Sequence, residues 1–147
     1  MKGFSYLSIL ALFLLSGCGG NSISRQLQSL SVSPTSATAQ GGQAQFTATG
    51  QFNMPPMTVT PATVAWFPSF PVIDPLPSGF GYSLTSQPFT AQCLQPGPMT
   101  VTAIAPMDTN ASANGVIPIP VFLDLVTNQK ATQEGGFVAA TSTLTCP

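Results

Sequence analysis

The stretch that decides the fold is LQSLSVSPTSATAQGGQAQFTATGQF, residues 27–52. Its apolar residues recur at every second position: Leu30 and Val32 alternate with serines, and Phe46 lies in a run with the same spacing. Alternation of this kind is typical of a strand with one face buried and the other in water. The Gly-Gly pair at 41–42 is turn chemistry. We therefore expect two strands that flank this turn.

Two later runs have the same period, one around Val101 and one around Leu144. The 15 prolines, spread through 147 residues, leave no room for a long amphipathic helix beyond the N-terminal segment. Several short strands with frequent turn signals predict an all-β sandwich. Two segments fit this pattern poorly. Residues 68–81 are long for a loop, and 106–136 form a long excursion in which 116–125 could add an edge strand or hairpin.

The N-terminus has the layout of a secretory signal: Lys2, a short apolar run at 7–15, and then small residues. The run is too short to cross a bilayer, which needs about 20 apolar residues. It ends in Leu15-Ser16-Gly17-Cys18, which resembles the lipobox of bacterial lipoproteins. That resemblance implies a cleaved signal helix, a diacylglycerol group on the thiol of Cys18 and an acylated new terminus. The alternative is a plain secretory signal in which Cys18 is incidental.

These features divide the chain into a lipoprotein signal peptide (1–17), a tether (18–28) and one domain (29–147). Stable membrane anchoring takes two or more acyl chains, which a mature lipoprotein carries. In the lipoprotein family, a residue other than Asp after the lipidated cysteine, here Gly19, implies the outer membrane if the cell is Gram-negative. The expected location is thus the bacterial cell envelope, with the membrane as a partner through the lipid anchor.

Charged residues make up only 5% of the sequence, whereas about 25% is usual in globular proteins. The chain after the signal keeps two basic residues against four acidic ones. Such a surface cannot neutralise many phosphates, so nucleic-acid binding is not expected.

With Cys18 assigned to the lipid, Cys93 and Cys146 remain as one pair. An exported chain meets an oxidising compartment, where a pair of cysteines is usually bridged. Strand parity agrees, because Cys93 shares a face with Phe89 and Cys146 shares a face with Leu144, which are the faces that each strand would bury. We expect a Cys93–Cys146 disulfide.

Residues 27–52 also closely resemble the opening of bacterial immunoglobulin-like domains, of the kind found in invasins and intimins. Those domains open with Ser-x-x-Val-Ser-Pro, a Gly-Gly turn and a Gln-x-Phe-Thr-Ala-Thr-Gly strand. VAWF at 64–67 resembles their third strand with its buried Trp, and 94–105 and 141–146 resemble later strands. The segment 68–87 and the long excursion depart from the family pattern, so the middle of the topology stays open. The resemblance implies an immunoglobulin-like β-sandwich used for adhesion or protein interaction.

The residue inventory argues against an enzyme. The chain has no histidine, which excludes Ser-His-Asp and Cys-His mechanisms and His-ligated zinc or copper. Lys130 lies in a polar stretch expected to be exposed, whereas a catalytic lysine needs burial. Asp108 and Asn110 offer too few oxygens for calcium and suit an Asx turn. Residues 54–57, Met-Pro-Pro-Met, faintly resemble copper(I) spacing, but we interpret them as a turn whose methionines pack on the sandwich. We expect no catalytic residue, cofactor or metal.

Two Pro-rich segments, around residues 67–80 and 116–123, carry more apolar residues than a small core can hold. If these residues are exposed together, they mark a partner surface; if the segments fold over the sandwich, they form a satellite core. The candidate partner surface comprises Phe67, Phe70, Ile73, Phe80, Ile119 and Phe122.

The resulting prediction is a non-enzymatic, lipid-anchored envelope protein whose immunoglobulin-like domain serves adhesion or protein-protein interaction. Its partner would be a protein or another envelope component. The alternative is a small glycan- or ligand-binding surface lipoprotein, with Trp66, Tyr82 or the Phe-rich loop as the binding platform.

Overall fold

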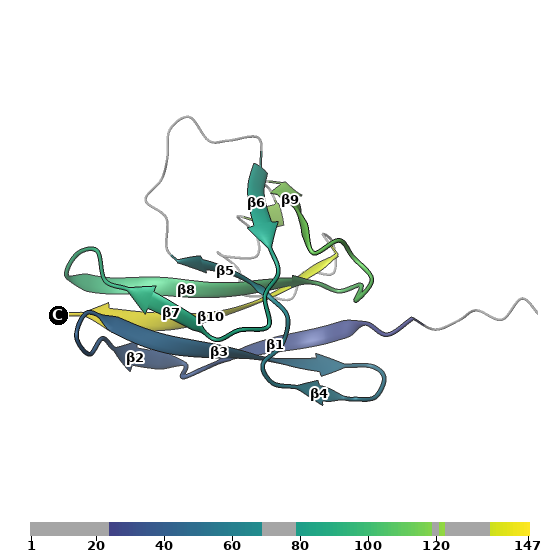
Figure 1. Ribbon diagram of the computed structural model, residues 1–147, viewed down its shortest axis with the longest axis horizontal. Coiled ribbons are helices and arrows are strands. Elements are labelled where there is room, and N and C mark those ends of the chain that lie inside the picture. The colour runs from purple at the N-terminus through teal and green to yellow at the C-terminus, as the bar shows by residue number, and fades with distance from the viewer. Residues whose placement is uncertain (1–23, 69–78, 119–120, 123–135) are drawn as a thin grey trace, which may run out of the picture.

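The computed structural model describes residues 24–68, 79–118, 121–122 and 136–147, and these residues make an all-β fold (Figure 1). Two four-stranded sheets lie one above the other, and a two-stranded ribbon stands on the second sheet. The described strands are β1 (Leu27–Ser33), β2 (Ser36–Thr38), β3 (Gln43–Phe52), β4 (Thr58–Val59), β5 (Ala65–Pro68), β6 (Gly79–Ser83), β7 (Phe89–Gln92), β8 (Gly97–Pro106), β9 (Asn114–Pro118) and β10 (Phe137–Cys146).

The all-β class expected from the alternating sequence is confirmed. The expected signal helix, the lipobox and Cys18 lie outside the described residues. Within the part of the chain that the structure describes, no helix has the length and hydropathy that a membrane span requires.

The first sheet is built around β3. β1 and β4 pair antiparallel with its two edges, since Leu30 and Val59 both face Gly50, and β7 pairs with the first four residues of β3. The Gly-Gly turn lies where the sequence predicts it. Gly41 and Gly42 both have positive φ (59° and 78°), which the tight turn into β3 requires and which glycine adopts without strain.

The second sheet has the order β2-β10-β8-β5. β8 and β10 pair antiparallel over ten residues, from Phe137 opposite Pro106 to Cys146 opposite Gly97. β2 joins this sheet parallel to β10, so the chain leaves the first sheet after β1 and enters the second. The crossing is held by the buried hydroxyl of Ser142, which donates a hydrogen bond of 2.7 Å to the carbonyl of Pro34.

The main core lies between the two sheets and draws on both of them. Alternation along each strand directs one set of side chains inward, as the sequence predicts. Its largest fully buried members are Phe46, Val64, Val101, Val138 and Leu144.

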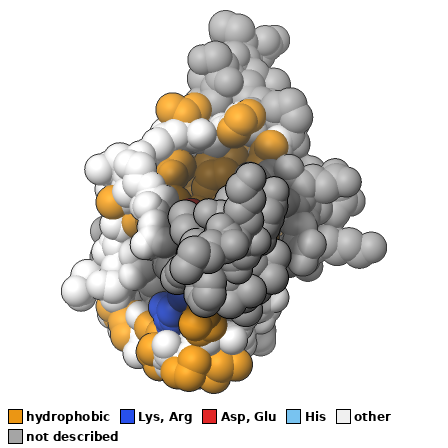
Figure 2. All heavy atoms as spheres, turned by 90° about the vertical axis from the view of Figure 1, so that its right-hand side faces the viewer, with side chains coloured by type: hydrophobic (Ala, Val, Ile, Leu, Met, Phe, Trp, Pro, Cys, Tyr) orange, Lys and Arg blue, Asp and Glu red, His pale blue; other side chains and the backbone are white. Residues whose placement is uncertain are grey.

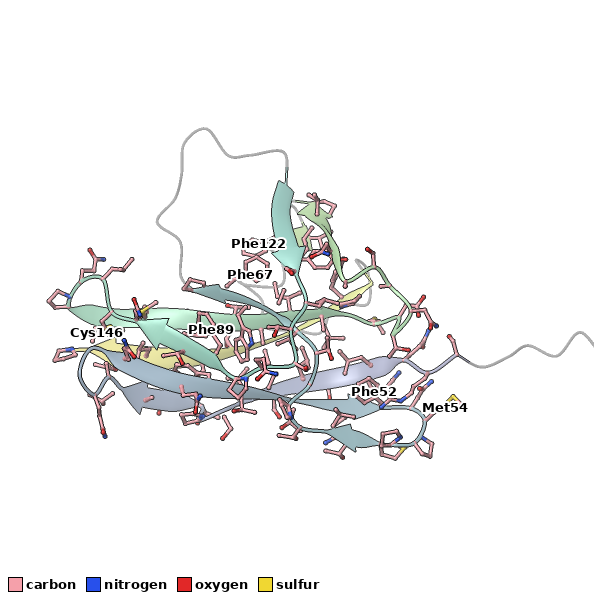
Figure 3. All side chains as sticks on the ribbon, in the orientation of Figure 1. Phe52, Met54, Phe67, Phe89, Phe122 and Cys146 are labelled. Atoms are coloured by element: carbon pink, nitrogen blue, oxygen red, sulfur yellow. A yellow bond between two sulfur atoms is a disulfide. The ribbon has the colours of Figure 1, made fainter. Side chains whose placement is uncertain are left out.

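The Cys93–Cys146 disulfide, with a Cα–Cα distance of 5.7 Å, links the residue after β7 to the end of β10. The predicted bridge is therefore confirmed. It joins the first sheet to the second at one end of the molecule (Figure 3).

A second core covers the outer face of the second sheet. β6 pairs antiparallel with β9, so the two segments that fit the sandwich pattern poorly meet in one ribbon, and Ile117 of β9 is fully buried. The sequence pattern predicts a wet outer face for β8, but Thr102 and Ile104 on that face are 3% and 1% exposed. That expectation is wrong for this part of β8 because the second core lies on it. The members of the second core are Ala65, Phe67, Ile104, Ile117, Phe122 and Ala139.

The ribbon depends on one close approach between its strands. Gly115 lies directly opposite Tyr82, and a Cβ atom at Gly115 would come within 2.8 Å of the Tyr82 ring. The missing side chain leaves room for the tyrosine, whose hydroxyl donates to the carbonyl of Ser112 at 3.3 Å and whose ring packs edge-on against Phe137.

Candidate functional site

The best-defined surface feature lies at the end of the molecule opposite the disulfide (Figure 3). We call it the Arg25 end and define it by three segments: residues 24–27, the turn 53–57 between β3 and β4, and the loop 107–111 after β8. The three segments are far apart in the sequence, and hydrogen bonds join them.

Arg25 organises this end. Its Nη2 donates to the carbonyl of Pro56 at 2.7 Å, and its Nε donates to the carbonyl of Met54 at 3.3 Å. The centre of the guanidinium lies 3.6 Å from the centroid of the Phe52 ring, which is the geometry of a cation–π contact. One planar cation therefore holds both ends of the Met54–Pro56 stretch and the last residue of β3.

Backbone groups reinforce the contact. The amide of Gln26 donates to Oδ1 of Asn53 at 2.7 Å, and the amide of Asn53 donates to the carbonyl of Gln26 at 3.1 Å. On the other side, the hydroxyl of Thr109 donates to the carbonyl of Arg25 at 3.0 Å, and the amide of Leu27 donates to the carbonyl of Met107 at 2.8 Å.

These bonds place the start of the folded domain earlier than the sequence suggests. The expected domain begins at residue 29, but β1 begins at Leu27 and residues 24–26 bond to two loops. The polar composition of 24–28 predicts a tether, yet polar groups also suit loop-to-loop hydrogen bonds. Whether this stretch is a tether or part of the fold depends on Asn53 and Thr109, which lie close enough in the folded chain to hydrogen-bond to residues 24–26.

The turn at this end carries exposed apolar side chains. Met54 is 37% exposed and Met57 is 53% exposed, and Pro55 and Pro56 between them are exposed as well. The prediction that both methionines pack on the sandwich is therefore wrong, because Arg25 takes the inner position against Phe52. Figure 2 looks onto this end of the molecule and shows apolar side chains gathered beside the side chain of Arg25, the one basic residue among those described.

A cavity of about 250 Å³ opens beside Arg25, and its lining comes from β1, β3, β4, the β4–β5 connection, β8, the loop after β8 and Leu84. Asp108 lies on its rim. Its Oδ1 accepts hydrogen bonds from the amide of Asn110 at 2.9 Å and from Nδ2 of the same residue at 3.3 Å, which is the expected Asx turn. Over the described ranges, no group of three or more Cys, Asp or Glu side chains is arranged to hold a metal ion.

The predicted partner surface needs correction at two of its residues. Phe67 and Phe122 are each 6% exposed and pack edge to face with ring centroids 5.2 Å apart. Both belong to the second core, so the satellite-core alternative holds for them. Phe80 pairs through its backbone with Ile117, and its side chain is not described. Phe70, Ile73 and Ile119 lie outside the described residues.

The two aromatic residues considered as a ligand platform are engaged within the fold. Trp66 is half-buried at the rim of the main core and stacks on Phe89, with ring centroids 5.4 Å apart and planes 13° apart. Its Nε1 is buried and meets no hydrogen-bond acceptor among the described residues. Tyr82 is held in the ribbon by Phe137 and Ser112. Each ring thus has one side occupied by a neighbouring element.

Comparisons with known proteins add no relative: no protein-family model matches the chain, and neither a curated protein nor a solved structure is significantly similar to it.

Proposed function

We propose that this chain is a lipid-anchored, non-enzymatic protein of the bacterial cell envelope, whose immunoglobulin-like domain serves adhesion or protein-protein interaction. The observation that carries the domain assignment is the order of the strands. In an immunoglobulin-like sandwich, the first, second and fifth strands share one sheet, and the third, sixth and seventh share the other.

The pairing here follows that plan when β1, β3 and β7 are taken as the first, second and fifth strands, and β5, β8 and β10 as the third, sixth and seventh. β2 is then the continuation of the first strand that crosses to the last one, and β4, β6 and β9 are additions. Trp66 lies on β5, the strand that carries the buried Trp of such domains. Binding residues are often carried by connecting segments that a rigid scaffold positions.

The lipid anchor rests on the sequence Leu15-Ser16-Gly17-Cys18. Metabolic labelling with a fatty acid should mark the wild-type chain and leave Cys18→Ala unlabelled. The Cys18→Ala chain should also leave the membrane fraction, because its anchor is missing. Equal labelling of the two chains would remove the lipid anchor from the proposal.

The interaction role is tested by crosslinking in intact cells. A photoreactive side chain at Val116, which is 62% exposed on the ribbon, should form a discrete adduct with one envelope partner. The same group at Ser31, exposed on β1 at a distance from the ribbon, is the matched control. Adducts of equal size and yield at both positions would mean random collision and would count against a recognition surface on the ribbon.

A small glycan or ligand is the second candidate, and the cavity beside Arg25 favours it. Its volume of about 250 Å³ is below the range of about 300–1,000 Å³ that is usual for small-molecule sites. Trp66 does not line this cavity, so acrylamide quenching of Trp66 fluorescence tests the other ligand platform, the Trp66 ring. We expect weak quenching that sugars leave unchanged, whereas strong quenching relieved by a sugar would favour the ligand-binding alternative.

A further inference from the structure

We infer that the Met54–Met57 turn is a membrane-contacting element, which touches the lipid surface next to the anchor and fixes the orientation of the domain on it. The inference rests on the proposed lipidation of Cys18, and it names the surface that the anchored domain turns toward the bilayer.

The first argument is the length of chain between the proposed anchor and the fold. Cys18 and Ser24 are six residues apart, and a polypeptide spans at most about 3.6 Å per residue, so Ser24 lies within about 22 Å of the lipidated sulfur whatever path the chain takes. A ten-residue strand such as β3 is about 33 Å long. The reach of the chain is thus shorter than the sandwich, so the domain cannot stand on the bilayer with its disulfide end down and its Arg25 end up.

The second argument is the position of the turn on that end. Asn53 bonds directly to Ser24 and Gln26, so the turn that follows it lies beside the first described residues. In Figure 3, Met54 projects at this extremity, close to the start of the described chain. An arrangement that brings Ser24 to the lipid surface therefore also brings the turn close to that surface.

The third argument is the chemistry of the turn. Met54 and Met57 are two of the four large apolar side chains that are exposed among the described residues, and two prolines separate them. Methionine is apolar and adaptable in shape, which suits the irregular boundary between head groups and acyl chains. Arg25 holds the turn in place through hydrogen bonds to the carbonyls of Met54 and Pro56. It is also the basic side chain at this end of the described chain. The formal charge of Asp108 at the same end offsets that of Arg25, so the apolar side chains of the turn make the contact with lipid.

Because two or more acyl chains already anchor the protein stably, the turn changes orientation rather than membrane affinity. The test must therefore report which face touches lipid. The full lipidated protein is reconstituted into phospholipid vesicles with a single added cysteine that carries an environment-sensitive fluorophore. Native cysteines do not react when Cys18 is acylated and Cys93 is bonded to Cys146. The fluorophore is quenched with a spin-labelled phospholipid.

We expect quenching at Met57→Cys to be several-fold stronger than at Val116→Cys, which is similarly exposed but on the ribbon. A label at Thr58→Cys should lose most of its quenching when Met54 and Met57 are both replaced by Asn. Leu94→Asn is the matched control, because Leu94 is 94% exposed and follows Cys93 at the disulfide end, and it should leave the signal unchanged. Retained disulfide and unchanged Trp66 emission show that each variant is folded.

Equal quenching at positions 57 and 116 overturns the inference while the lipoprotein assignment stands, because fatty-acid labelling of Cys18 is measured on the same samples. A label at position 57 that is shielded in native envelopes but not in pure lipid vesicles also overturns it and points to a protein on the turn. A chain that takes up no fatty acid overturns both proposals, and the labelling identifies that case.

Discussion

A single side chain, Arg25, connects the start of the domain to the β3–β4 turn. It lies in a stretch whose composition suggests a flexible linker, yet it makes two hydrogen bonds to carbonyls and stacks on Phe52. Guanidinium suits this position because its planar donors reach two carbonyls while its face lies on the ring. No pattern along the sequence indicates such a contact, since its partners lie 27 to 31 residues away.

Replacing Arg25 tests that contact. Arg25→Ala should lower the free energy of unfolding by about 1–2 kcal/mol, since it removes a cation–π contact and two hydrogen bonds at a partly exposed site. Arg25→Lys should recover little of the loss, because an ammonium group cannot make the same planar contact. Urea denaturation followed by Trp66 fluorescence measures both. Gln28→Ala, exposed on β1, is the control, and an Arg25→Ala midpoint equal to that of the control would contradict the assigned role.

Ser142 is a second residue whose role depends on the fold. It occupies an inward-facing position of β10, where the alternating pattern predicts an apolar residue, and its hydroxyl instead bonds to Pro34 at the crossing between sheets. Ser142→Ala should cost about 1 kcal/mol, because the part-buried hydrogen bond from its hydroxyl to the Pro34 carbonyl is lost. Ser31→Ala, on the exposed side of β1, should change stability by less than about 0.5 kcal/mol. Equal effects of the two substitutions in urea denaturation would mean that the hydroxyl is not important for the crossing.

Among the strands, the ribbon of β6 and β9 departs most from the sequence expectation. The long strands β3, β8 and β10 are predicted by their alternating apolar and polar residues. Successive side chains of a strand point to opposite faces, one buried and one exposed. β9 lies at the start of the segment expected to add a strand, but its partner is β6, more than 30 residues earlier, and not a neighbouring hairpin strand. No pattern within either segment indicates which residues of β6 pair with which residues of β9.

The same lack of a sequence signal for long-range pairing explains why the partner surface predicted at Phe67 and Phe122 is wrong. Whether Phe67 and Phe122 face water or a core depends on whether another element covers the outer face of the second sheet, which composition cannot decide. The apolar excess in both segments is a correct sign of long-range burial. It does not reveal which surface is buried.

Neighbouring residues of β9 test whether the ribbon is an integral part of the domain. Ile117 is fully buried and Val116 is 62% exposed, so the two side chains point to opposite faces of one strand. Ile117→Ala should lower the free energy of unfolding by about 2–5 kcal/mol, whereas Val116→Ala should change it by less than about 0.5 kcal/mol. Chemical denaturation measures the free energy of unfolding of both variants. Similar small effects for both would indicate that the ribbon folds independently of the sandwich.

For the molecule as a whole, the disulfide is the strongest link between the sheets, and it is also the feature that the sequence predicts best. With Cys18 set aside for the proposed lipid, the two other cysteines leave one pairing, and strand parity gives both thiols the buried side. The bridge closes a separation of 53 residues, so its loss should destabilise the domain by about 4 kcal/mol in the chain-entropy account.

That value is measured by comparing urea unfolding of the wild type with that of a Cys93→Ala, Cys146→Ala double variant. The variant should keep a β-type circular dichroism spectrum with a lower midpoint. Adding a reductant should lower the wild-type midpoint toward that of the variant and leave the variant unchanged. A reductant that shifts the variant equally would show that the loss comes from another source.

The parallel pairing of β2 with β10 has a mechanical consequence if the chain is anchored at Cys18 as proposed. The described chain starts at one end of the molecule, and β10 finishes at the other (Figure 1). A pulling force between those ends slides β2 along β10, so their hydrogen bonds are loaded together in shear and do not open one after another. Load that reaches Cys146 passes through the disulfide into Cys93 next to β7, and both layers share it. We expect this geometry to resist unfolding by a pulling force better than a ladder of three residue pairs would if it were opened one pair at a time.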